Sequence, residues 1–364
     1  MSHRPSKKAV NDADTYYCSR NAFCLRFFGS IVILVGCYSA LVVLVDPRGD
    51  FGTQIFRQVT MDSRITKMAL FDLYSRRTPV DGIVIGSSRS MKVSPSLLEA
   101  ATQKRWFNFS VDSAQAEDYL AIFRWAHRRD IHLSMLAIGL DVEALHDSSA
   151  MDARLERNPM LMAELGYKGN VSDVYSRVQG FLRLLKSSLS RSYAQDILES
   201  LVATFYHLPP SSSFDANGLL HYNKWEGERN SGPAALNARI SQSKEEYRRR
   251  FQGMHNLSIV REEEIETLLD EAGRDKIRIV LWITPLHPTL ITYLEKESNY
   301  EALLENTENY VRDIGLRFEI PVFDFSSPES FGGTDDHWFD GAHIDDVNAL
   351  LLEKRLEKAL PAKR

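Results

Sequence analysis

Serine, aspartate and histidine residues at two distant places in the chain could together activate a nucleophile. Ser88 lies in the stretch GSSR at positions 86–89, directly after the apolar residues 82–85, and Asp340 and His343 lie near the C-terminus, three residues apart. A serine hydroxyl attacks a carbonyl only when a base accepts its proton and a third group orients that base. We therefore predict a triad with Ser88 as nucleophile, His343 as base and Asp340 as the residue that orients the imidazole.

The C-terminal segment also permits a metal-site hypothesis. His337, Asp340 and His343 are residue types that bind zinc or a similar ion. A second cluster of ligands with suitable spacing does not appear in the sequence, and the spacing of a phosphate-binding loop is absent after Gly86. We therefore expect a site without cofactor or metal, and keep the metal site as the alternative.

Short apolar runs that alternate with helical patterns indicate how these residues are positioned. A continuous apolar run is typical of a strand covered on both faces, and strands that alternate with helices form parallel sheets. We predict an α/β fold, a three-layer α/β/α sandwich with a parallel sheet. Its strands are expected at residues 82–85, 106–111, 133–140, 277–283 and 321–325, and its helices at 61–76, 113–128, 300–316 and 346–360.

The candidate residues lie where such a fold binds ligands, beyond the carboxyl ends of the strands. The polar residues that follow the five strands are, in order, Ser88, residues 108–113, Asp141, His287 and residues 335–343. The alternation of strands and helices is interrupted between about residues 145 and 250. Helical patterns at 174–189, 193–206 and 234–251 predict a mostly helical insertion there. An insertion of this length often covers a site.

An uncharged segment near the N-terminus predicts a membrane anchor. Residues 27–45 are 19 residues without a charge, which matches the roughly 20 that a helix needs to cross a bilayer. Residues 1–26 carry five lysines and arginines against two aspartates, so this tail is expected in the cytoplasm. A buried core helix and a cleaved signal peptide are the alternatives. We expect a single-pass inner-membrane protein with a juxtamembrane segment at 46–78 and a periplasmic or otherwise extracytoplasmic domain at 79–360.

Composition excludes some classes of partner. The formal charge of −5 and the scattered basic residues argue against nucleic acid as a partner. The three cysteines, Cys18, Cys24 and Cys37, all lie in the tail or the predicted span. The predicted extracytoplasmic domain therefore has no disulfide and no cysteine-based metal site.

The two separated blocks resemble a known superfamily. A Gly-x-Ser after the first strand and an Asp-x-x-His before the last helix resemble the first and last blocks of the SGNH, or GDSL-type, hydrolases, over residues 81–360 without the insertion. The resemblance implies an SGNH-like fold with Ser88 as nucleophile and Asp340 and His343 as its partners. The segments FNFSVDSAQAEDY and ITPLHP look closest to the membrane-anchored branch that includes alginate acetylation proteins and the teichoic acid D-alanylation protein.

Two positions depart from the pattern of that superfamily. Its second block supplies a glycine whose amide holds the oxyanion, and Ser113 stands at that place. Its third block supplies an asparagine, and Asp141 stands there instead. An ionised carboxylate donates no hydrogen bond. Either Asp141 is protonated, or the oxyanion hole uses the amides of Ser88 and Ser113 together with Asn108, or the site is weak.

Each candidate also has an ordinary structural interpretation. Ser88 would be a turn or capping serine, Asp141 would cap a helix that begins at Val142, and His287 would be a loop residue. Arg89 would be a surface charge, or would bind an anionic substrate beside Ser88.

The resemblance and the anchor together imply a membrane-anchored serine esterase or O-acyltransferase. Its implied substrate is an acylated, in particular an acetylated, polysaccharide of the cell envelope. Its implied partner is a multi-spanning membrane O-acyltransferase that delivers the acyl group. The alternative is a non-catalytic member that assembles or scaffolds the machinery of polymer modification.

Overall fold

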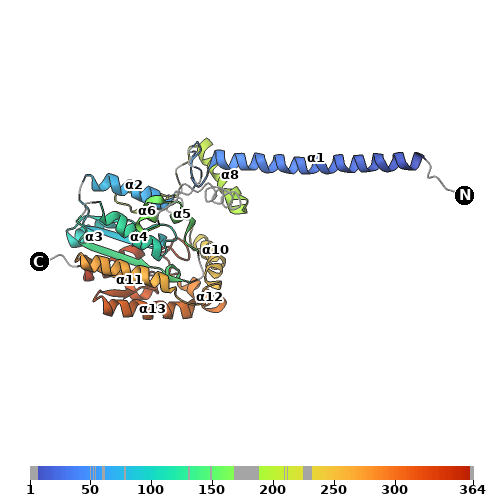
Figure 1. Ribbon diagram of the computed structural model, residues 1–364. Helices are drawn as coiled ribbons and strands as arrows, with labels where there is room; N and C mark the ends of the chain where they lie inside the picture. The colour runs from blue at the N-terminus through green and yellow to red at the C-terminus, as the bar shows by residue number, and fades with distance from the viewer. Residues whose placement is uncertain are drawn as a thin grey trace. The chain divides into compact units, whose positions relative to one another are not determined.

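The chain divides into two compact units, which are described separately. A computed structural model describes residues 7–360, except 50, 52, 54, 60–61, 78, 130–131, 148–149, 168–187, 209, 211 and 224–231. The smaller unit comprises Met1–Met61 and Val171–Pro209, and the larger unit comprises Asp62–Asn170 and Pro210–Arg364. Figure 1 shows the long helix α1 in the smaller unit and the sheet with its helices in the larger one.

A parallel sheet of five strands forms the centre of the larger unit. The strand order is β2-β1-β3-β6-β7, and every neighbouring pair is parallel. This confirms the predicted α/β class and its parallel sheet. The strands are β1 (Gly82–Gly86), β2 (Trp106–Asn108), β3 (Met135–Leu140), β6 (Arg278–Ile283) and β7 (Val322–Asp324). The second strand is shorter than predicted, although the amides of Phe109 and Val111 still donate to carbonyls of β1.

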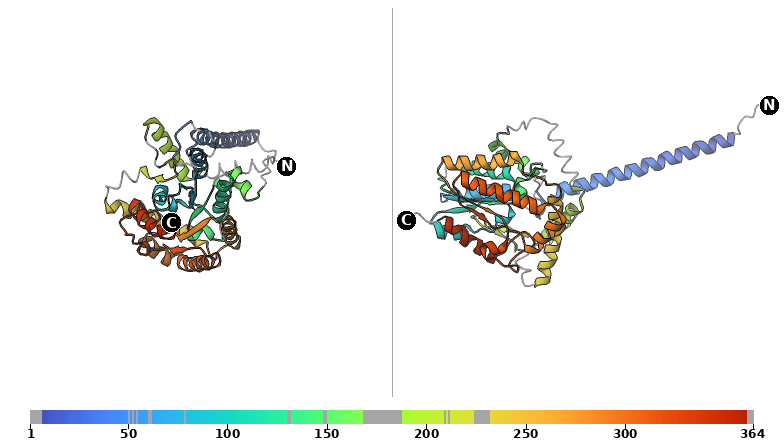
Figure 2. Two further views of the ribbon diagram at one scale, coloured as in Figure 1. Left: turned by 90° about the vertical axis from the view of Figure 1, so that its left-hand side faces the viewer. Right: turned by 90° about the horizontal axis from the view of Figure 1, so that it is seen from below.

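Helices cover both faces of this sheet. Successive side chains of each strand point to opposite faces, so a strand contributes side chains to the apolar cluster on each face. In β1, Ile83 and Ile85 belong to one apolar cluster and Val84 belongs to another. The first cluster includes side chains of α4 (Ala116–His127), α11 (Ile259–Arg274) and α13 (Tyr300–Arg317); the second includes side chains of α3 (Pro95–Thr102) and α14 (Asp346–Leu356). In the right-hand view of Figure 2, the strands run between the orange helices and the dark red C-terminal helix.

Capping residues explain where several helices begin. Helix α3 starts at Pro95 after Ser94, whose hydroxyl accepts the amide of Leu97, and Asp345 accepts two amides at the start of α14. A polar side chain at this position satisfies amides that have no partner within the helix. The acidic run at 262–264, which we interpret as a solvated helix face, lies in α11, whereas α12 (Pro288–Glu297) was not predicted.

The predicted insertion contains helices and a small hairpin. Its described part holds α5 (Ala153–Glu156), α6 (Pro159–Glu164), α8 (Arg191–Phe205), α10 (Pro233–Gln252) and the antiparallel pair β4 (Ser213–Phe214) and β5 (Leu220–His221). The hairpin was not predicted. Of the predicted helix at 174–189, residues 174–187 lie outside the described residues.

The two units differ from the predicted boundaries in two places. Helix α2 (Ser63–Ser75) belongs to the larger unit, because Met68 and Phe71 are buried in its core and Arg64 forms an ion pair with Asp118 in which both side chains are fully buried. Helix α8, which we placed in the insertion, belongs to the smaller unit, where it packs against the end of α1.

Helix α1 (Lys7–Val45) contains the predicted membrane span. Its part Phe23–Val45 has a mean hydropathy of 2.5, and among the described residues it is the helix long and apolar enough to cross a membrane. The side chains of Val32 and Leu34 are 70% and 68% exposed within the protein. Such exposure is not typical of a core helix.

Candidate active site

The polar turn after β1 presents one of its three serines. Ser88 opens a short 3-10 turn at Ser88–Ser90 and is partly exposed, whereas Ser87 and Ser90 are buried. The hydroxyl of Ser87 accepts the amide of Arg89 and so holds the turn. A Cβ atom at Gly86 would lie 2.5 Å from Ser90 Oγ, so glycine is required there for the turn to close. The turn therefore leaves only Ser88 available for chemistry.

The loop before α14 brings Asp340 and His343 to Ser88. His343 Nε2 lies 2.9 Å from Ser88 Oγ, and His343 Nδ1 lies 2.9 Å from both carboxylate oxygens of Asp340. The amides of Ala342 and His343 donate to Asp340 Oδ1 at 2.8 and 2.9 Å, which fixes the carboxylate within its own loop. The side chains of His343 and Asp340 are 17% and 14% exposed. The three predicted residues thus form one continuous chain of hydrogen bonds.

Electrostatics favour the charged forms of both partners of Ser88. Burial raises the pKa of Asp340, but the imidazole of His343 and the two loop amides lower it more, and the net pKa lies below its usual value. Burial lowers the pKa of His343, but the charge of Asp340 raises it more, and the net pKa lies above 6.5. In the neutral imidazole, a proton on Nδ1 bonded to Asp340 makes Nε2 the nitrogen that can accept the proton of Ser88.

A pocket of about 370 Å³ opens beside Ser88. Its walls combine strand ends with the inserted helix α10: Ser113 follows β2, Asp141 and Glu143 follow β3, and Tyr247 belongs to α10. Space for a small ligand is therefore present at the carboxyl ends of the strands, where the fold predicts one.

Ser113 has the backbone geometry that the resemblance implies for a glycine. Its φ is +49°, in the left-handed region that residues other than glycine rarely adopt. It lines the same pocket as Ser88, and within the described chain neither residue's amide donates a hydrogen bond. The two amides are therefore available to a ligand in the pocket.

Asp141 and Arg89 belong to a buried polar cluster next to Ser88. Thr284 Oγ1 donates to Asp141 Oδ1 at 2.6 Å, and Asp141 Oδ2 lies 3.8 Å from Arg89 Nε. Asp141 occupies the cap position of the turn at Val142–Leu145, but its side chain forms no capping hydrogen bond. The interpretation of Asp141 as a helix cap is therefore wrong, and its carboxylate serves the cluster instead.

Arg89 is not the surface charge that we considered. It is 4% exposed, bonds to Glu143, donates to Thr284 Oγ1 at 3.3 Å and lies 5.2 Å from the ring of Tyr247. Burial lowers the pKa of Arg89, but Asp141 and Glu143 raise it more, and the net pKa lies well above its usual value. The guanidinium is already paired, so its role is to hold the ends of β3 and β6 beside Ser88.

Asn108 and His287 do not reach the pocket. Both amide hydrogens of Asn108 are donated to the carbonyls of Ser90 and Val93, so the prediction that it donates to the oxyanion is wrong. His287 Nδ1 accepts the amide of Thr289 at the start of α12, and its Nε2 lies 3.1 Å from the carbonyl of Asp335. His287 therefore caps a helix and fastens the loop that carries Asp340.

Helix α10 contacts the site at four-residue intervals, and these contacts were not predicted. Arg239 donates to the carbonyl of Phe339 at 2.5 Å, Ser243 Oγ accepts the amide of Gly341 at 3.2 Å, and Tyr247 packs on Arg89. Residues four apart share one face of a helix. The polar spacing 239, 243 and 247 was the available signal, but nothing local indicates which loop that face meets.

The carboxylates and histidines of the 335–346 segment form separate pairs. His337 Nδ1 lies 3.0 Å from Asp345 Oδ2, whereas His343 contacts Asp340. Among the described residues, no group of three or more histidine, cysteine or acidic side chains is placed to hold a metal ion. The residues of the metal-site alternative thus do not converge on one point.

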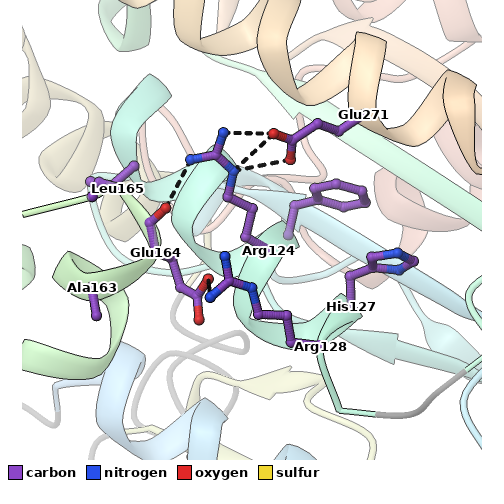
Figure 3. A pocket seen from close by; sticks show the side chains of 9 residues that line it. Arg124, His127, Arg128, Ala163, Glu164, Leu165 and Glu271 are labelled. Atoms are coloured by element: carbon purple, nitrogen blue, oxygen red, sulfur yellow. Dashed lines mark hydrogen bonds and ion pairs between the residues drawn. The ribbon is translucent and has the colours of Figure 1, made fainter.

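A second pocket, of about 410 Å³, lies between helices α4, α6 and α11 (Figure 3). Arg124 donates to both carboxylate oxygens of Glu271 and to the carbonyl of Glu164, and Arg128 pairs with Glu164 at 3.0 Å. These bonds join the three helices, and no serine is among the residues that line the pocket. It is a structural ion-pair cluster.

Comparison of the chain with known proteins gave no match, either among protein-family models or among curated proteins.

Proposed function

We propose that the chain is a membrane-anchored serine acyl-esterase or O-acyltransferase with an SGNH-like domain. The observation that carries this proposal is the continuous Ser88–His343–Asp340 hydrogen-bond chain, which ends at a partly exposed hydroxyl beside a pocket. Placement at the carboxyl end of β1 in a parallel sheet supports it, because ligands bind at such ends.

In the proposed reaction His343 accepts the proton of Ser88 while Ser88 Oγ attacks the carbonyl carbon of an acyl ester. The negative oxygen of the tetrahedral intermediate lies near the free amides of Ser88 and Ser113. His343 returns the proton to the leaving alcohol, and the acyl group stays on Ser88. Water or an acceptor hydroxyl then attacks the acyl-serine in the reverse sequence of steps, which yields hydrolysis or transfer.

The oxyanion hole of this proposal has two donors rather than three. Asp141 stands where the resemblance implies an asparagine, and it accepts a hydrogen bond from Thr284 rather than donating one. Removing one donor from such a hole costs about 10²–10³-fold in rate. We therefore expect slower chemistry than in a member with three donors, and activity that depends strongly on both amides.

The proposed substrate is an acylated, in particular an acetylated, polysaccharide of the cell envelope, and the proposed partner is a multi-spanning membrane O-acyltransferase that delivers the acyl group. The apolar helix Phe23–Val45 supports membrane anchoring, and the basic excess of residues 1–26 supports a cytoplasmic N-terminus with an extracytoplasmic domain. The substrate itself is inferred from the resemblance and from the anchor.

Labelling by a fluorophosphonate probe tests the proposal, because the probe reacts with an activated serine and requires no knowledge of the substrate. Full-length protein in detergent is expected to be labelled on Ser88, as located by mass spectrometry of its peptides. Ser90→Ala is the matched control, because Ser90 Oγ is buried and has no hydrogen-bond partner among the described residues. Labelling that survives in Ser88→Ala and is lost in Ser90→Ala would overturn the assignment.

The alternative function is a non-catalytic scaffold of the same machinery, and Asp141 at the expected donor position favours it. The scaffold hypothesis predicts a folded wild-type protein that neither reacts with the probe nor releases acetate from an acetyl ester. Labelling of Ser88 together with acetate release would exclude it.

A further inference from the structure

Helix α8 of the smaller unit has one face against α1 and an apolar face that is exposed. Tyr193 and Ile197 are buried in a cluster with Val42 and Val45 of α1. The exposed apolar side chains at and beside α8 are Leu189, Leu198, Val202, Phe205, Tyr206 and Leu208. Residues 198, 202 and 205 are spaced as neighbours on one side of a helix, and Phe205 is 73% exposed. Water is a poor solvent for such a face.

Polar contacts fasten α8 along the end of the apolar helix. The hydroxyl of Tyr38 donates to the carbonyl of Ser188 at 2.5 Å, Arg48 pairs with Asp196 at 2.6 Å, and Ser200 Oγ donates to the carbonyl of Arg57 at 2.6 Å. Tyr38 lies seven residues before the end of α1 at Val45, which is about 10 Å along a helix. The start of α8 is therefore held beside the last two turns of the apolar segment.

We propose that α8 is a second membrane-binding element, whose exposed apolar face lies in the boundary between lipid headgroups and acyl chains where α1 leaves the bilayer. This inference rests on the membrane anchor of the proposed function and not on its chemistry. The depth of α8 in the bilayer follows from the contact between Tyr38 and Ser188. A bilayer that surrounds Phe23–Val45 also surrounds a segment that packs beside the last turns of this helix. Aromatic residues such as Phe205 and Tyr206 are enriched in this boundary layer, and an amphipathic helix lies in it with its apolar face inward.

Spin labels on the full-length protein in phosphatidylcholine–phosphatidylglycerol vesicles test this inference. Cys18, Cys24 and Cys37 are replaced by serine, and a single cysteine is introduced as Val32→Cys in the span, Phe205→Cys in α8, or Leu316→Cys in α13. Leu316 is the matched control, since it is also an exposed apolar side chain on a helix, 76% exposed, but belongs to the larger unit. Relaxation of each label by oxygen, which concentrates in lipid, is compared with relaxation by a water-soluble nickel chelate.

The expected result is oxygen-dominated relaxation at positions 32 and 205 and nickel-dominated relaxation at 316, with Val202→Cys repeating the result of Phe205→Cys. Nickel-dominated relaxation at 205 and 202 with oxygen-dominated relaxation at 32 would overturn the inference and leave the anchor intact. Nickel-dominated relaxation at 32 would overturn the anchor as well. Labels at 205 and 202 shielded from both reagents would also overturn the inference, because a second copy or another protein would then cover α8.

Discussion

Two histidine–aspartate pairs lie within the segment 337–345, and only one of them contacts Ser88. His343 bonds to Asp340 and to Ser88, and its side chain is 17% exposed. His337 bonds to Asp345, and its side chain is 40% exposed. The same two residue types at similar distances therefore serve different purposes, and an imidazole–carboxylate pair alone does not identify a catalytic base.

The other hydrogen bonds of the two carboxylates explain the difference. Asp340 accepts the amides of Ala342 and His343, so it holds the loop that carries its own histidine. Asp345 accepts the amides at the start of α14 and so acts as a helix cap. One pair places an imidazole against the hydroxyl of Ser88, whereas the other fixes the start of a helix.

Removing Ser88 or His343 is expected to have the largest effect on activity. Ser88→Ala and His343→Ala are each expected to lower kcat/KM for an acetyl ester on the order of 10⁶-fold, because a triad loses its function when either reacting member is missing. The double variant is expected to be no slower than either single one. His337→Ala, which removes the other imidazole, is the control and should retain the wild-type rate. A comparable loss in His337→Ala would show that the two pairs had been distinguished wrongly.

Replacing the orienting carboxylate is expected to have the second largest effect. Asp340→Asn keeps the size of the side chain but no longer favours the tautomer with a proton on His343 Nδ1, and it should lower kcat about 10⁴-fold. Steady-state kinetics on the same ester measure this change. Activity within a few-fold of wild type would mean that Asp340 holds its loop and takes no part in the orientation of His343.

A change of pH is expected to have a smaller effect than these substitutions. Raising the pH should increase kcat/KM but lower the contribution of His343 to stability. Because Asp340 raises the pKa of His343 above 6.5, kcat/KM is expected to fall about tenfold per pH unit below that raised pKa, as the base becomes protonated. The same shift stabilises the fold when His343 is charged. This contribution is fully present below pH 6.5, the ordinary value, and is lost as the pH rises through the raised pKa.

Asp340→Asn tests the origin of that profile. Without the carboxylate, burial is the main effect on His343 and lowers its pKa, so the acid limb of the residual probe-labelling rate should move to lower pH. His337→Ala should leave the limb where it is. An unchanged limb in Asp340→Asn would assign the titration to another group.

The sheet could be predicted from local apolar patterns, and the triad from residue types in two separated blocks that resemble those of a known superfamily. Apolar runs gave all five strands of the sheet within a few residues, and the order of Gly-x-Ser and Asp-x-x-His placed Ser88 with Asp340 and His343. Positions where parallel strands end meet at one edge of the sheet, so the side chains that follow them meet as well.

Contacts made across long distances in the chain could not be predicted in the same way. Asn108 was expected to face the pocket, but its amide is taken up by the carbonyls of the turn after β1. Arg89 was considered as a surface charge or as a residue that binds an anionic substrate, but carboxylates from the β3 end and a ring from α10 bury it. Which partner a polar side chain finds depends on packing that a single sequence does not display.

Replacing Asp345 is expected to have the smallest effect, and to change the stability of the protein rather than its reaction rate. Asp345→Ala removes the side chain that accepts the amides of Val347 and Asn348, and the loss of such a cap should lower the free energy of unfolding by about 1 kcal/mol. Thermal unfolding of the full-length protein in detergent measures the loss, and kcat/KM on the acetyl ester should stay near wild type because the bond between Asp340 and His343 is intact. Asp345→Asn, which can still accept an amide, should recover most of the stability. If Asp345→Ala lowered kcat/KM as strongly as Asp340→Asn, both pairs would act on Ser88, and the difference between a catalytic and a capping carboxylate would not hold for this loop.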